Sequence, residues 1–101
     1  TYDLCFTAGL LIHIAPDSLR TVYDILYQRS SRYILVYEYY HPTPVEVSYR
    51  GHQNKLFKRD FAGELLDLYP SLELVSYEFI YHRDPCFPDD DLTWFLMKKS
   101  D

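Results

Sequence analysis

The sequence predicts an α/β fold, and three observations support this prediction. Two short apolar runs, at residues 2–7 and 33–40, have the composition of strands. About fifteen residues from Pro16 onward repeat apolar side chains at the period of an amphipathic helix. A strand, a helix and a second strand of this kind form a βαβ unit, whose strands pair parallel through a right-handed crossover.

Each element in the first half follows from a local pattern. The run at residues 2–7 is apolar without clean alternation, which is typical of a strand buried on both faces. Pro16 suits the first turn of a helix. Apolar residues then recur at i, i+3, i+4 and i+7, namely Leu19, Val22, Tyr23 and Leu26. The helix should end near residues 30–31.

The middle of the chain predicts a strand and a long loop. Residues 33–40 begin as a continuous apolar run, so they should form the second buried strand. Residues 41–58 follow, and Pro42 and Pro44 exclude a helix at their start, while Arg50-Gly51 is typical of a turn. A connector of this length is often functional.

The last third predicts one helix and a strand hairpin. Asp60 is a good N-cap, and Phe61, Leu65 and Leu68 form an apolar stripe before Pro70 ends the helix. Residues 75–82 alternate as in a strand, and residues 92–99 form a final strand. Since no helix separates these two strands, we expect them to pair antiparallel.

Composition limits the broad class. The chain has 101 residues, 48% hydrophobic and 25% charged, which fits one globular domain over residues 1–101 and excludes a disordered tail. No apolar run approaches the ~20 residues that span a bilayer, and no signal-peptide pattern is visible. Cys5 and Cys86 form no disulfide framework, so we expect both to be reduced in a cytoplasmic protein.

Charge is distributed unevenly. The net charge of -5 makes the chain a poor general binder of nucleic acid or anionic membrane. Four basic residues nevertheless lie together with no acid between them: Arg50, Lys55, Lys58 and Arg59. They are either solvated loop residues or a site for a phosphate or carboxylate.

Ligands of open α/β sheets bind outside the carboxyl ends of the parallel strands. This rule selects residues 8–15 and 39–58. His13 could act as a general base, and Glu38 is a second candidate at the end of its strand. The pocket-lining candidates are Tyr39, Tyr40, His41 and Tyr49, although local hydrogen bonding and packing are the alternative for all of these residues.

Other chemistry has little support. The histidines lack zinc-site spacing, and Asp89-Asp90-Asp91 lacks the alternating ligands of a calcium loop, so no metal site is predicted. A nucleophile elbow, a P-loop and a G-x-G-x-x-G pattern are all absent from the sequence.

Two stretches carry a resemblance to a known family. Residues 3–14, followed by Pro16 and an amphipathic helix, resemble the fourth strand and next loop of class I S-adenosylmethionine-dependent methyltransferases. Residues 38–51, continued by residues 55–64, resemble the methyltransferases associated with pseudaminic acid biosynthesis, and the closing strands are similar as well. The first motif is generic to many methyltransferases and the second is distinctive.

The resemblance implies a Rossmann-like sheet in the order 3-2-1-4-5-7-6, with the last strand antiparallel. The four expected strands take positions 4, 5, 6 and 7, so the chain would be the C-terminal half of an enzyme, without the half that carries most of the cofactor site. The remaining residues expected to bind S-adenosyl-L-methionine are Thr7, Ala8, Gly9 and Leu10.

The implied activity is methyl transfer to a small anionic acceptor, plausibly a sugar acid or nucleotide-linked sugar. His13 or Glu38 would orient or deprotonate the acceptor. The residues expected to hold it are Tyr39, Tyr40, His41, Tyr49, Arg50, Lys55, Lys58 and Arg59. A non-catalytic α/β binding module and an inactive fragment are the alternatives.

The chain opens at Thr1, without an initiator methionine and directly before the first strand. A processed, trimmed or incomplete chain is therefore expected. Alone, its first strand would present an unpaired apolar edge, and one sheet face would lack helices. We expect the isolated chain to self-associate there or to need the other half of the domain, and to be inactive.

Overall fold

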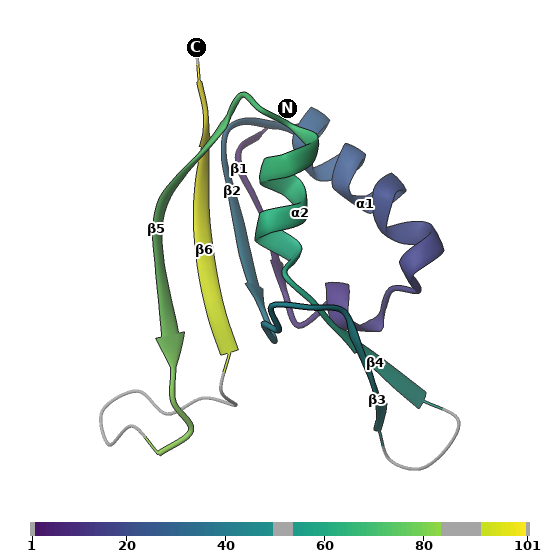
Figure 1. Cartoon of the computed structure of the whole chain (residues 1–101). Coiled ribbons are helices and arrows are strands. Elements are labelled where there is room, and N and C mark those ends of the chain that lie inside the picture. The colour runs from purple at the N-terminus through teal and green to yellow at the C-terminus, as the bar shows by residue number, and fades with distance from the viewer. Residues whose placement is uncertain (1, 50–53, 84–91, 101) are drawn as a thin grey trace.

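The computed structural model describes residues 2–49, 54–83 and 92–100 (Figure 1). They form a small mixed α/β fold, in which a four-stranded sheet carries two helices and a separate two-stranded hairpin. The elements in chain order are β1 (Tyr2–Ala8), the 3-10 turn η1 (Leu11–His13), α1 (Pro16–Arg29), β2 (Ser30–Glu38), β3 (Val45–Tyr49), β4 (Asn54–Lys58), α2 (Phe61–Leu68), β5 (Leu72–Ile80) and β6 (Leu92–Lys99).

The sheet has the strand order β1-β2-β6-β5. β1 and β2 pair parallel, with Thr7 opposite Val36, which confirms the predicted βαβ unit. β6 is antiparallel to both of its neighbours. The predicted antiparallel pairing of the last two strands is therefore confirmed, and β6 stands between β2 and β5 rather than at an edge.

α1 matches its predicted start and face. Pro16 begins the helix, and Leu19, Tyr23 and Leu26 are buried. Ser30 already has extended backbone angles, so β2 follows the helix with no loop between them. The second strand therefore spans residues 30–38 and not the predicted 33–40.

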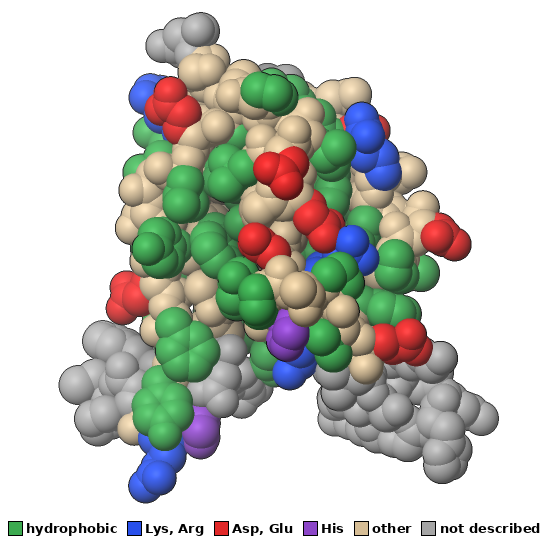
Figure 2. Space-filling model, in the orientation of Figure 1, with side chains coloured by type: hydrophobic (Ala, Val, Ile, Leu, Met, Phe, Trp, Pro, Cys, Tyr) green, Lys and Arg blue, Asp and Glu red, His purple; other side chains and the backbone are tan. Residues whose placement is uncertain are grey.

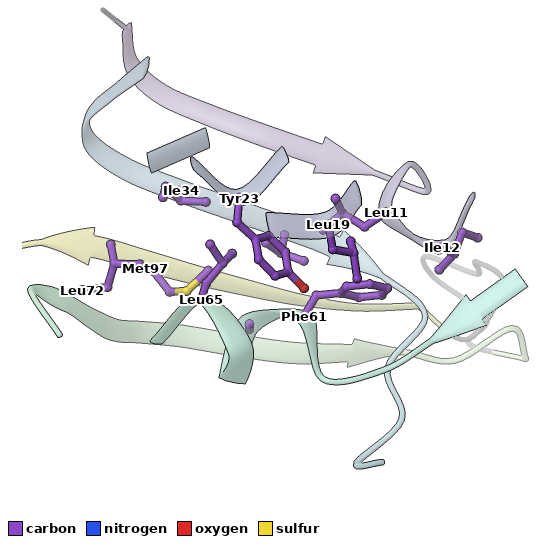
Figure 3. Packing of buried hydrophobic residues seen from close by; sticks show 11 residues of the cluster. Leu11, Ile12, Leu19, Tyr23, Ile34, Phe61, Leu65, Leu72 and Met97 are labelled. Atoms are coloured by element: carbon purple, nitrogen blue, oxygen red, sulfur yellow. The ribbon is translucent and has the colours of Figure 1, made fainter. Parts of the chain in front are cut away.

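One core lies between the sheet and the two helices (Figure 3). α1 contributes Leu19 and Tyr23, α2 contributes Leu65, and the sheet contributes Ile34 and Met97, which are register partners. Because side chains of both helices join this single cluster, α1 and α2 cover the same face of the sheet.

The opposite face is bare in the described part of the chain. Leu4 and Phe6 of β1 are 44% and 63% exposed, and they face the same side as their register partners Tyr33 and Leu35. The prediction that the first strand is buried on both faces is wrong, because among the described residues β1 is an edge strand whose one pairing partner is β2. The predicted unpaired edge and helix-free face are both present.

Residues 41–58 are not the single long loop that was predicted. β3 and β4 form an antiparallel hairpin in which Val45 lies opposite Lys58. Val45 and Val47 alternate with Glu46 and Ser48, which is a strand pattern that the two prolines before it obscured. The predicted turn at residues 50–51 lies outside the described residues.

α2 begins as predicted, with the Asp60 side chain accepting a hydrogen bond from the Gly63 N–H at 2.9 Å. Phe61 and Leu65 are buried, whereas Leu68 is exposed at the end of the helix. The helix is short, and it leaves β5 uncovered alongside it (Figure 1).

Candidate functional site

The loop after β1 turns sharply at Gly9. This residue has φ +67°, a left-handed conformation that favours glycine, and its N–H donates to the Tyr37 carbonyl at 3.0 Å. A Cβ at Gly9 would meet no atom within 4 Å, so backbone conformation, and not crowding, explains the glycine. The turn directs the chain into η1.

Glu38 holds this loop in place from the neighbouring strand. Its side chain is buried, and its two carboxylate oxygens accept hydrogen bonds from the N–H groups of Leu10 and Leu11, each at 3.1 Å. The first N–H groups of a helical turn have no partner within the turn, so a carboxylate there stabilises the turn. Both oxygens are thereby engaged, which makes Glu38 a positioning residue for the loop.

The four expected cofactor residues lie together where β1 ends. Thr7 is buried, and its hydroxyl oxygen has no hydrogen-bond partner among the described residues. Ala8 and Leu10 are exposed on either side of Gly9. This short segment therefore offers an open backbone turn, while the Thr7 hydroxyl lies inside the fold and not on its surface.

His13 ends η1, and its ring is exposed on the surface. It belongs to the turn that Glu38 anchors, so the two expected catalytic residues are linked through the backbone. β4 contacts η1, which brings the hairpin beside this turn.

The three residues that follow β2, Tyr39 to His41, each have a neighbour within the fold, and the Tyr40 side chain is exposed as well. The Lys58 ammonium lies 5.1 Å from the centre of the Tyr39 ring, a cation–π arrangement. Tyr40 is exposed, and its ring packs against Phe95 at a centroid distance of 5.9 Å. The His41 Nδ1 atom lies 2.6 Å from the Thr43 carbonyl oxygen, so this ring folds back onto its own turn.

Arg59 is already paired within the fold. Its Nε donates to Glu64 at 2.5 Å, and the Tyr23 hydroxyl donates to the other oxygen of the same carboxylate at 2.7 Å. Burial and the hydrogen bond to Glu64 raise the pKa of the Tyr23 phenol far above its ordinary value. Glu64 therefore ties α2 to α1 through Tyr23, and Arg59 would have to leave this carboxylate in order to bind a substrate anion.

The basic cluster is only partly placed. Arg50 lies outside the described residues, and for Tyr49 and Lys55 only the backbone is described, in β3 and β4. The structure brings Lys58 and Tyr39 together and packs Tyr40 against β6; of the four cations it describes the side chains of Lys58 and Arg59, each of which contacts a partner within the fold.

Sequence reasoning missed a hollow of about 450 Å³ beside α2, here called the aromatic groove. Its lining residues are Tyr40, Asp60, Ala62, Gly63, Leu66, Leu74, Tyr77, Glu78, Phe79, Thr93 and Phe95. The signal was present in β5, where Tyr77 and Phe79 alternate with other residues. That alternation predicted a strand but not which face would stay open.

Within the described ranges, no group of three His, Cys, Asp or Glu side chains could hold a metal ion. Likewise, none of the helices seen in these ranges is long and apolar enough to cross a membrane. No protein-family model matches the chain, and a search of curated proteins finds no significant match.

Proposed function

We propose that this chain forms the C-terminal part of a class I S-adenosylmethionine-dependent methyltransferase domain. The observation that carries the proposal is the strand order β1-β2-β6-β5, with β6 antiparallel to its neighbours. This order matches 4-5-7-6, the last four positions in the sheet of this class. In both, the strand that comes last in the sequence lies between its two predecessors, so β5 stands at the edge of the sheet.

The helix-free face supports the same proposal. A right-handed crossover from β1 to β2 places α1 on one face of the sheet. In a doubly wound sheet the order in which parallel strands are added reverses on the far side of β1. The crossover helices of those strands therefore cover the opposite face of the sheet. A further parallel strand with its crossover helix, added beside β1, would therefore pair the open edge with its strand and cover Leu4 and Phe6 with its helix.

A second copy of this chain would do less. Pairing of two β1 edges about a twofold axis would extend the sheet but leave both apolar faces without helices, while face-to-face packing would leave both edges unpaired. One partner that satisfies edge and face together is a strand-helix unit, which is what the N-terminal half of such a domain supplies.

Thr7, Ala8, Gly9 and Leu10 fit one wall of a cofactor site. The Gly9 turn leaves open space, Leu10 presents an apolar side chain, and the buried Thr7 hydroxyl has no partner among the described residues. S-adenosyl-L-methionine would supply a methyl group on a sulfonium for direct transfer. The glycine-rich loop and the acidic residue that hold its ribose in this class have no counterpart in these residues, so the missing half would supply them.

For the acceptor, we place a small anionic molecule near η1 and the β3–β4 hairpin. Lys58 would hold the anion together with Tyr49, Arg50 and Lys55, which the sequence predicts for this role, and His13 is the candidate that takes the proton from the attacking atom. Glu38 fixes the turn that carries His13. The work of these residues is mainly positioning and exclusion of water.

The test is a methyl-transfer assay on the polypeptide encoded together with the sequence upstream of Thr1, using labelled S-adenosyl-L-methionine and nucleotide-sugar acceptors. We expect transfer that Lys58→Glu weakens through KM, and none from residues 1–101 alone. Absence of transfer by the longer polypeptide, or an upstream sequence without a strand running into a glycine-rich loop, would favour the alternative of a non-catalytic binding module.

A further inference from the structure

The aromatic groove has the size of a small-molecule site. Its volume of about 450 Å³ falls within the range of roughly 300–1,000 Å³ typical of ligand pockets. It lies between the first turn of α2 and the exposed strand β5, on the face that the helices cover. Figure 2 shows hydrophobic side chains along the side of the molecule where β5 lies, next to acidic side chains over α2.

Three aromatic rings form one side of this groove. The Phe95 ring lies 5.9 Å from the Tyr40 ring and 5.9 Å from the Tyr77 ring, centre to centre. Tyr77 and Phe79 nevertheless remain 64% and 55% exposed. Rings that are held by neighbours but not covered offer faces and edges against which a flat ligand can stack.

The polar groups of the groove favour one sign of charge. Asp60 is the acidic side chain at its end, where one oxygen accepts the Gly63 N–H. Glu78 faces the other side of the sheet, because its register partner is Trp94, whereas Tyr77 and Phe79 pair with Phe95 and Thr93. Among the described residues that line the groove there is no Lys, Arg or His, so an anion would find no cationic partner among them.

We propose that the aromatic groove binds a flat, apolar small molecule that is neutral or positively charged, such as an aromatic ring with an amine substituent. The ring would stack on Tyr40, Tyr77 and Phe79, and an ammonium would lie toward Asp60 and over the ring faces. This proposal needs neither the cofactor nor the missing half of the domain, so it stands or fails separately from methyl transfer.

The test compares three indoles of matched shape and different charge, namely tryptamine (cation), 3-methylindole (neutral) and indole-3-acetate (anion). Binding is followed by the backbone amide NMR signals of Gly63 and Thr93 at neutral pH. We expect saturable shifts at both signals, with tryptamine bound about two- to fivefold more tightly than indole-3-acetate, as for a surface ion pair. Asp60→Asn keeps the helix cap, since Asn and Asp cap equally well, and should reduce this difference.

Two controls separate the groove from the bare sheet face. Tyr77→Ala should weaken all three probes at least twofold, and Tyr40→Ala provides the same test should the first variant fold poorly. Phe6→Ala removes an equally exposed ring on the opposite face and should change nothing. The proposal is overturned by an absence of saturable shifts at Gly63 and Thr93, by equal affinity for cation and anion, or by a Phe6→Ala loss as large as that of Tyr77→Ala.

Discussion

The Glu38 carboxylate accepts a hydrogen bond from the backbone N–H of Leu11 at 3.1 Å. This bond joins the carboxyl end of β2 to the turn that follows β1, across 27 residues of sequence. The turn carries His13, and its entry contains Gly9. The geometry of the proposed site therefore depends on a buried acid that does not itself need to contact substrate.

Replacing Glu38 tests this dependence. In Glu38→Gln one amide oxygen can still accept a hydrogen bond, but the amide NH₂ faces a second N–H donor. We expect a loss of about 1–3 kcal/mol in the free energy of unfolding, measured by urea denaturation. Glu73→Gln, at an exposed site on β5, is the matched control and should stay within about 0.5 kcal/mol of the wild type. Equal unfolding midpoints for both variants would rule out the anchoring role.

Gly63 should behave unlike an ordinary helix glycine. Gly→Ala in a helix interior normally stabilises by about 1 kcal/mol. Here a Cβ would lie 2.2 Å from the Asp60 Oδ2 atom, so the added methyl group displaces the capping carboxylate. We expect Gly63→Ala to lower the thermal midpoint, because displacing the capping carboxylate, at a cost of up to about 2 kcal/mol, outweighs a helix gain of about 1 kcal/mol.

The same idea predicts a reversal of sign. In an Asp60→Ala background the carboxylate is gone, so Gly63→Ala should then stabilise the protein. A double-mutant cycle by thermal denaturation measures this coupling. Purely additive effects would show that Asp60 and Gly63 do not constrain one another.

Tyr69 should control the acidity of Asp24. The Tyr69 hydroxyl donates a hydrogen bond to the Asp24 carboxylate, and this bond, together with the hydrogen bond and the charge of Arg20, holds the pKa of Asp24 below its usual value. A carboxyl group whose pKa is lowered by folding stabilises the protein above its unfolded pKa of about 3.9, and this stabilisation disappears as the pH falls through the folded pKa. In Tyr69→Phe the pKa of Asp24 should rise, as NMR titration of its carboxyl carbon would report.

Tyr27→Phe is the control for that titration. The Tyr27 ring stacks on Tyr69 with centres 4.1 Å apart, but its hydroxyl contacts Ser71. Removal of this hydroxyl should leave the pKa of Asp24 unchanged, since Tyr27 does not hydrogen-bond to that carboxylate. The same shift in both variants would show that the pKa of Asp24 does not depend specifically on the Tyr69 hydrogen bond.

The open edge and bare face of the sheet should cause self-association of residues 1–101. We expect sedimentation at ~100 μM to show species larger than the monomer, since unpaired strand edges and exposed apolar surface drive association at such concentrations. Phe6→Lys, on the bare face, should shift the distribution toward monomer. Ile25→Lys changes a similarly exposed apolar residue on α1 and should have little effect. A monomeric wild type would contradict this prediction.

Much of this fold could be predicted from local patterns. Pro16 and the spacing of Leu19, Tyr23 and Leu26 located α1, and the Asp60 cap located the start of α2. These signals lie within a few residues of the element they define. The parallel pairing of β1 with β2 then follows from the helix that connects them, and the right-handed crossover rule decides which face α1 covers.

The remainder depended on contacts between distant residues. Nothing near Glu38 in the sequence indicates that it bonds to Leu10 and Leu11, and nothing near Arg59 indicates its pair with Glu64 and Tyr23. Burial was misjudged for the same reason. An apolar run such as that of β1 is typical of a strand buried on both faces. The second face of β1 is covered, however, only when a further strand-helix unit packs beside it.

Calorimetric titration of S-adenosyl-L-methionine into residues 1–101, and into the polypeptide extended upstream of Thr1, tests the assignment to a methyltransferase sheet. We predict stoichiometric binding by the extended polypeptide and no measurable heat from residues 1–101, because Thr7 to Leu10 provide only one wall of the site. No binding by the extended polypeptide would contradict the assignment to a methyltransferase sheet.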